Sequence, residues 1–195
     1  MMASQAARVA MTYFPSLPDA PHLADVYRRF PEHVKPMLDY HDRLLRGESP
    51  LTVAERELIA AYVSGLNACQ FCLGAHKLYA EVFGVDPALV DAMLTDLDSA
   101  SVDEKLKPLL HYAAKLNSLP PKLTADDARA AYAAGWSERA LFDVIEVTAL
   151  FNYMNRIVEG AGVTFSYDEN PPDEDEKQAR RARSYSDFGK MLGVE

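Results

Sequence analysis

Apolar residues recur at helical spacing along most of the chain. One clear example is the run Leu58, Ile59, Tyr62, Val63 and Leu66, whose i, i+3, i+4 pattern gives one apolar face of an α-helix. No segment shows the alternation of β-branched and polar residues, bounded by turns, that is typical of strands. The pattern therefore predicts an all-α fold, built as a multi-helix bundle.

Helix start and stop signals divide this pattern into segments. Thr52 and Glu55 form a capping box, Pro87 follows Asp86 at a first helical turn, and Gly84 is suited to a left-handed helix end. The helices expected are 33–46, one from Thr52, one containing the cysteines and ending at Gly84, one from Asp86, and others near 103–116, 124–135 and 137–160.

The composition of the two ends differs from that of the middle. Residues 1–20 carry Pro15 and Pro18 and are followed at once by Pro21, so they are predicted to be an irregular lead-in, and residues 21–165 are predicted to form the helical domain. Residues 166–195 form a charged C-terminal arm, in which an acidic run precedes arginines and scattered aromatic residues. This arm is either a solvated, partly helical tail or a segment whose apolar residues pack on a neighbouring subunit.

Charge and cysteine usage narrow the class of protein. Hydrophobic residues make up 49% of the chain, as in an ordinary globular protein. The formal net charge is −9, and a charge of this sign repels nucleic acid and anionic membranes. No run of about 20 apolar residues is present, so no membrane span is expected. The two cysteines lie within four residues, which in a reducing compartment favours redox or metal chemistry over a structural disulfide. We therefore expect a cytoplasmic protein.

The cysteines form part of the sequence Asn67-Ala-Cys69-Gln-Phe-Cys72-Leu-Gly-Ala-His76. Asn67 is a good N-cap, and with Gln70 three residues later it predicts a helix that begins at residue 68. Cys69 would then lie in the first turn, where free N–H groups and the helix dipole favour a thiolate.

Helical spacing places the two thiols and the imidazole on one face. At about 100° per residue, Cys69 and Cys72 lie roughly 60° apart, and His76 lies within about 40° of both. One thiol can attack, the second can resolve the product as a disulfide, and the imidazole can carry the proton. Two alternatives remain: a metal site using these three side chains, or two cysteines buried as small apolar residues.

Glu57 is a candidate proton partner for His76. On a single unbroken helix it would lie about 18 Å from Cys69 and could not take part. Gly65 and Asn67 provide a chain turn, however, so two antiparallel helices could bring the carboxylate to the imidazole, orient it and raise its basicity.

The spacing Glu57-x11-Cys69-x-x-Cys72-x3-His76 resembles the alkylhydroperoxidase D (AhpD) family of the carboxymuconolactone decarboxylase-like superfamily. The flanking Glu55-Arg-Glu-Leu-Ile59 and Phe151-Asn-x-x-Asn-Arg156 resemble its peroxidase-related subgroup. The resemblance covers roughly residues 35–165. It implies an all-helical subunit that assembles into trimers or hexamers.

The resemblance also implies an activity and a role for each site residue. Cys72 would attack a small-molecule hydroperoxide, Cys69 would resolve the product, and Glu57 and His76 would form the proton relay. The cycle implies a dithiol reductant of lipoyl or thioredoxin type and no bound cofactor. This sequence departs from the best-known family pattern in one respect, because Phe71 stands where that pattern has a histidine.

Other functions stay open on the sequence. The superfamily's other chemistry is a lactone decarboxylase or lyase reaction, which needs no thiol pair. A third interpretation is a non-catalytic helical assembly that senses redox state or binds zinc. Of the remaining histidines, only His41 is a candidate to border the site, while Asn152, Asn155 and Arg156 form either a polar network beside it or ordinary packing contacts.

Overall fold

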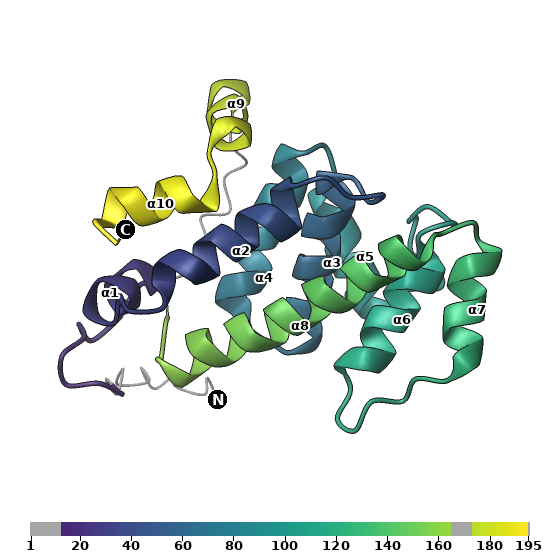
Figure 1. The fold of residues 1–195 in the computed structure, drawn as a ribbon, viewed down its shortest axis with the longest axis horizontal. Helices are drawn as coiled ribbons and strands as arrows, with labels where there is room; N and C mark the ends of the chain where they lie inside the picture. The colour runs from purple at the N-terminus through teal and green to yellow at the C-terminus, as the bar shows by residue number, and fades with distance from the viewer. Residues whose placement is uncertain (1–12, 165–172, 195) are drawn as a thin grey trace, which may run out of the picture.

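The computed structural model describes residues 13–164 and 173–194, and all regular secondary structure within these residues is helical (Figure 1). This confirms the all-α fold class. The helices are α1 (Leu23–Arg29), α2 (Val34–Arg46), α3 (Val53–Leu66), α4 (Gln70–Val82), α5 (Pro87–Thr95), α6 (Lys107–Asn117), α7 (Ala125–Ala133), α8 (Glu138–Gly160), α9 (Glu174–Ala182) and α10 (Tyr185–Leu192).

Three of the helices begin at the residues that the sequence indicated. Thr52 and Glu55 form a reciprocal capping box at the start of α3, and Thr124 and Asp127 form another at α7. Ser137 accepts a hydrogen bond from an N–H of the first turn of α8. Each cap satisfies backbone groups that have no partner within the helix, which explains why these local signals located the helix starts.

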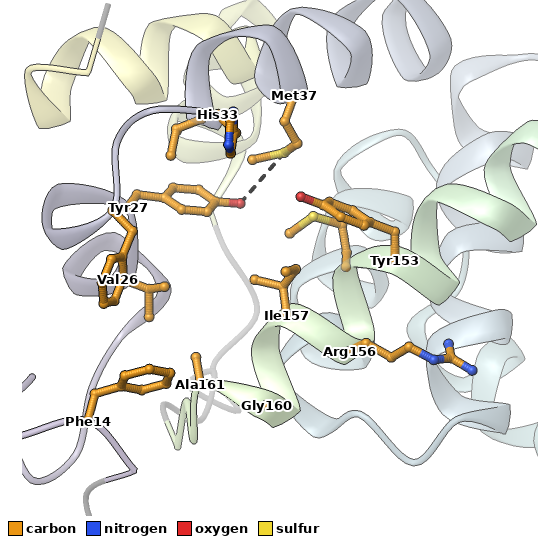
Figure 2. Close-up of a pocket in the computed structure, with 13 residues that line it drawn as sticks. Phe14, Val26, Tyr27, His33, Met37, Tyr153, Arg156, Ile157, Gly160 and Ala161 are labelled. Carbon is orange, nitrogen blue, oxygen red and sulfur yellow. Dashed lines mark hydrogen bonds between the residues drawn. The ribbon is translucent and has the colours of Figure 1, made fainter.

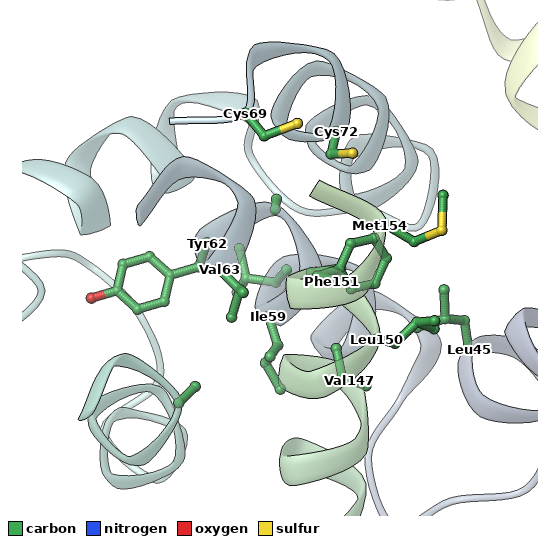
Figure 3. Packing of buried hydrophobic residues seen from close by; sticks show 14 of the residues in the cluster. Leu45, Ile59, Tyr62, Val63, Cys69, Cys72, Val147, Leu150, Phe151 and Met154 are labelled. Carbon is green, nitrogen blue, oxygen red and sulfur yellow. The ribbon is translucent and has the colours of Figure 1, made fainter. Parts of the chain in front are cut away.

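Helix α3 is the centre of the bundle. It packs against α2, α4, α5, α6 and α8, and its buried residues lie all around the helix rather than along one stripe. A helix that is apolar all round belongs in a core. Ile59 and Val63 of α3 are fully buried, as are Val147 and Phe151 of the long helix α8 (Figure 3).

Helix α1 is an element that the sequence analysis did not include. Its cap is an unusual one: the Nδ1 atom of His22 accepts the N–H of Ala24 at 3.0 Å, while Asp25 accepts the N–H of His22 at 3.0 Å. Histidine is not among the preferred N-cap residues. The segment is also only one to two turns long, so its periodic signal was too short to recognise.

The turn before α4 corrects the predicted helix start. Asn67 is the C-cap of α3, not the N-cap of α4, and Cys69 is the N-cap of α4 rather than a first-turn residue. The backbone N–H groups of residues 67, 68 and 69 still donate to carbonyls of α3, and Ala68 has a positive φ of 56°. The Asn67 side chain is engaged by other asparagines, so it is not free to cap α4.

Ala68 makes this turn at a cost that substitution can reveal. A left-handed conformation is unfavourable for alanine by about 1–2 kcal/mol, and glycine removes that cost at the expense of about 0.4–1 kcal/mol of unfolded-state entropy. The Ala68 side chain is exposed, so neither change disturbs packing. We expect Ala68→Gly to raise the free energy of unfolding in urea by about 0.5 kcal/mol, and Ala68→Val to lower it by about 1 kcal/mol. The reverse order would contradict the assigned turn.

The C-terminal segment folds back onto the same chain. Helix α10 lies along α2 (Figure 1). The N–H groups of Tyr185 and Ser186 donate to the carboxylate of Asp42 at 2.6 and 2.8 Å, which caps the start of α10. Gly189 is buried against Leu38 of α2. Neither interpretation of the arm from sequence included this contact. The linking residues 166–172 and the last residue of the predicted arm lie outside the described residues.

Candidate active site

Glu57 and His76 meet in the core of the bundle. Because α3 and α4 run antiparallel after the turn at residues 67–69, the Oε2 atom of Glu57 lies 2.6 Å from Nδ1 of His76. Glu57 is fully buried and His76 is 6% exposed. The predicted chain turn therefore does bring the carboxylate to the imidazole.

The other carboxylate oxygen of Glu57 has two partners that the sequence analysis missed. Arg46 of α2 forms an ion pair with Oε1, and the hydroxyl of Tyr185 of α10 donates to the same atom at 3.1 Å. The guanidinium of Arg46 also lies 5.0–5.3 Å from the ring centres of Tyr79, Phe83 and Tyr185. These contacts hold Arg46 in one place and so fix the carboxylate.

These partners keep Glu57 ionised. Burial alone would raise the pKa of its carboxyl group, but attraction to His76 and then to Arg46, with a hydrogen bond to each, holds the pKa below its ordinary value. Arg46 in turn has a raised pKa despite its own burial, because it faces the Glu57 charge. A buried, ionised carboxylate bonded to an imidazole is the arrangement that orients a histidine for proton transfer.

Both thiols are free and buried at the start of α4 (Figure 3). A hydrogen bond between them lowers the pKa of Cys69, against the opposing effect of burial. The same bond, together with burial, raises the pKa of Cys72. In the resting protein Cys69 is therefore the more acidic thiol, in agreement with its place at the helix N-terminus.

A cavity of about 270 Å³ gives the two thiols different access. Cys72 and His76 line it, whereas Cys69 does not. Phe71, which stands where the best-known family pattern has a histidine, also lines the cavity. The cavity is lined by His22, Leu23, Tyr27, Leu38, His41, Phe71, Cys72, Ala75, His76, Tyr79, Phe151, Met154, Arg180, Arg183, Ser184, Tyr185 and Phe188.

His41 borders the site, as the sequence left open. Its Nδ1 atom lies 2.8 Å from the carbonyl oxygen of Met37, and its ring packs beside those of Phe151 and Tyr185. Burial lowers the pKa of His41 to about 4, so the imidazole is neutral near pH 7. It adds a polar group to the cavity without adding charge.

Asparagines connect the turn before α4 to α6 and α8. Asn67 donates to Asn155 at 2.8 Å, Asn117 donates to Asn67 at 2.9 Å, and Asn152 donates to Asn117 at 2.6 Å. A hydrogen bond from Asn155 lowers the pKa of Cys72, against the larger effects that raise it. These hydrogen bonds form a polar network that reaches the thiols, and the same bonds join α6, α8 and the turn before α4, so both interpretations of the asparagines stay open.

A second cavity, of about 340 Å³, lies between α1, α2 and the end of α8 (Figure 2). Its walls are mostly apolar, and inside it the hydroxyl of Tyr27 lies 3.8 Å from the sulfur of Met37. Neither cysteine, nor Glu57, nor His76 lines it. The cavity of about 270 Å³ is therefore the candidate active site, since Cys72 and His76 line it.

The described residues contain neither a cluster of metal-binding side chains nor a membrane-spanning helix. Nowhere among the described residues do three or more His, Cys, Asp and Glu side chains gather in a way that could hold a metal ion. None of the helices in residues 13–164 and 173–194 has the length and apolar character needed to cross a membrane.

Comparisons with known proteins agree with this fold. Residues 31–115 match the model of the carboxymuconolactone decarboxylase family. An uncharacterized peroxidase-related protein from Silicibacter sp. TM1040 has a similar structure, with a TM-score of 0.67 and 27% identity over 73% of this chain and 74% of that one.

A second solved structure has the same fold. It is described as an alkylhydroperoxidase AhpD core, an uncharacterized peroxidase-related protein from Ralstonia eutropha JMP134, with a TM-score of 0.66 and 24% identity over 77% and 76% of the two chains. No functionally curated protein matched the sequence. The family match over residues 31–115 and the shared fold support the assignment of this chain as AhpD-like, within the carboxymuconolactone decarboxylase superfamily.

Proposed function

We propose that this protein is a thiol-dependent peroxidase that reduces hydroperoxides through Cys72 and Cys69. One observation carries the proposal: Cys72, hydrogen-bonded to a second thiol, lines the same cavity as an imidazole that is held by a buried carboxylate. Access favours Cys72 as the attacking thiol, because the more acidic Cys69 does not line the cavity.

The first step oxidises Cys72 and reduces the peroxide. His76 takes the Cys72 proton, and the thiolate attacks the terminal peroxide oxygen. The O–O bond breaks, and the leaving alkoxide takes the proton back from His76 as an alcohol. Cys72 becomes a sulfenic acid. The Nδ1 contact to Glu57 leaves Nε2 of His76 for this exchange and stabilises the imidazolium that forms.

The second step resolves the sulfenic acid. The Cys69 thiolate, whose pKa is already lowered, attacks the Cys72 sulfur, an S–S bond forms, and hydroxide leaves as water with one proton. A dithiol then supplies two electrons by thiol–disulfide exchange and is itself oxidised to a disulfide. We propose a lipoyl- or thioredoxin-type dithiol for this role, and a trimer or hexamer as the working assembly.

Titration with a hydroperoxide tests the proposal. One equivalent of cumene hydroperoxide added to the reduced protein is expected to give one Cys69–Cys72 disulfide within the chain, seen by mass spectrometry as the loss of two hydrogens and of both alkylation sites. Two free thiols after excess peroxide, or direct formation of a Cys72 sulfinic acid, would contradict it.

A lactone decarboxylase is the second candidate, because the matching family model carries that name. That reaction has no use for a thiol pair. A variant with both cysteines changed to serine would keep decarboxylase activity toward a carboxylated muconolactone if this candidate is correct, and would have no peroxidase activity in either case.

A further inference from the structure

The charged side chains that line the active-site cavity are arginines. No aspartate or glutamate is among the described residues that line it, although the chain carries 29 acidic residues. Two arginines do line the cavity: Arg180, in the last turn of α9, and Arg183, directly after this helix. In a chain with a net charge of −9, a cavity lined by arginines and by no carboxylate favours an anionic ligand.

Arg183 is the better placed of the two arginines. Arg180 is already paired with Glu176 at 2.6 Å, whereas Arg183 is exposed and has no ion pair or side-chain hydrogen bond within the described residues. Both arginines line the cavity together with Tyr79. Burial raises the pKa of the Tyr79 phenol, and the positive charges of the two arginines act against this rise. A guanidinium without a partner can bind a carboxylate through two parallel hydrogen bonds.

Much of the cavity wall is apolar. Phe71, Phe151, Met154 and Phe188 line the cavity, and Cys72, which also lines it, is 3% exposed. A ligand that reaches Cys72 therefore has its reacting end among apolar side chains, while an opposite charged end can stay at the solvent-exposed Arg183.

We propose that the cavity selects an organic hydroperoxide that carries a carboxylate on an apolar body, with the carboxylate bound by Arg183. Only the hydroperoxide end of this ligand rests on the proposed peroxidase function. The anion site itself depends on Arg183 and on the cavity charge. Fatty-acid hydroperoxides have this chemistry, and their esters lack it.

Binding of an unreactive probe tests the anion site without turnover. By calorimetry we expect octanoate to bind more tightly than octanol. Arg183→Ala should weaken octanoate binding about tenfold, which is the lower range for a charged hydrogen bond at a partly exposed site. Octanol binding should not change in this variant. Arg183→Lys is expected to recover part of the affinity. The control is Arg129→Ala, an exposed arginine away from the cavity that should leave both affinities unchanged. Equal binding of octanoate and octanol, or unchanged octanoate binding in Arg183→Ala, would overturn the proposal.

Turnover then tests the substrate class. With a dithiol reductant, kcat/KM for linoleic acid hydroperoxide is expected to exceed that for its methyl ester about tenfold, and Arg183→Ala should bring the ratio of the two values down to about one. Consumption of both at equal rates would refute the substrate class. If the wild-type protein reduced neither compound, the peroxidase function would fail, and the octanoate result would still decide the anion site.

Discussion

The Cys72→Ser protein is expected to lose peroxide consumption by roughly a thousandfold or more, because it lacks the only cavity-lining thiol among the described residues. A serine hydroxyl cannot be oxidised to a sulfenic acid, and Cys69 is buried and does not line the cavity. The measurement is dithiothreitol-driven consumption of cumene hydroperoxide. Turnover at the wild-type rate would exclude Cys72 as the attacking residue.

Cys69→Ser is the matched control, since it removes the other thiol of the same turn. This variant should reduce one equivalent of peroxide and then stop, with a sulfenic acid on Cys72 that dimedone traps. The comparison separates access from acidity, because Cys69 has the lower pKa whereas Cys72 lines the cavity. If Cys69→Ser lost the first equivalent and Cys72→Ser retained it, the two roles would be reversed.

Glu57→Gln is expected to lower both stability and activity. The substitution keeps the shape of the side chain but removes the charge that Arg46 and His76 face in the core. Breaking a buried ion pair from one side costs about 3 kcal/mol or more, because the remaining charge stays buried without its partner. Urea unfolding measures this loss. Glu48→Gln, at an exposed glutamate outside the site, should change stability by less than about 0.5 kcal/mol.

Activity should fall in the same variant, since a neutral amide neither orients the imidazole as firmly nor stabilises its charged form. We expect kcat for peroxide reduction to drop about a hundredfold, within the usual range for general acid–base assistance. A Glu57→Gln protein with wild-type stability and rate would show that the carboxylate is a packing residue only.

The same carboxylate sets a pH dependence of stability. The pKa of Glu57 is lower in the folded protein than in the unfolded chain, so the unfolded state binds more protons between the two values. The contribution of Glu57 is therefore fully present above the unfolded pKa of about 4.3 and is lost as the pH falls through the folded pKa. Glu57→Gln should remove this part of the acid dependence, and Glu48→Gln should not.

The sequence predicted the helices whose ends carry strong local signals. Thr52, Thr124 and Ser137 begin helices because a side-chain cap depends only on residues within one turn. The short helix α1 lacked a common cap and was missed. Asn67 misled the prediction for a related reason: its side chain is used by Asn155 and Asn117, which are distant in sequence, and so it cannot cap the helix that follows.

The candidate site was also predicted only in part from local patterns in the sequence. Helical periodicity by itself placed Cys69, Cys72 and His76 together, because four residues are one turn of any helix. The turn after α3, which brings Glu57 to His76, was only one of the possible paths of the chain, and the packing of α3 on α4 decided it.

What the sequence alone determined about this protein is its helical class, most of its helix starts and the thiol–imidazole face. Only the tertiary structure decided what surrounds Glu57 and what closes the cavity. Tyr185, 128 residues away from Glu57 in the chain, bonds to it because Asp42 caps α10 and α10 packs on α2. Local patterns report energies within one or two turns, whereas these contacts depend on how whole helices pack, and no pattern within a single segment encodes that.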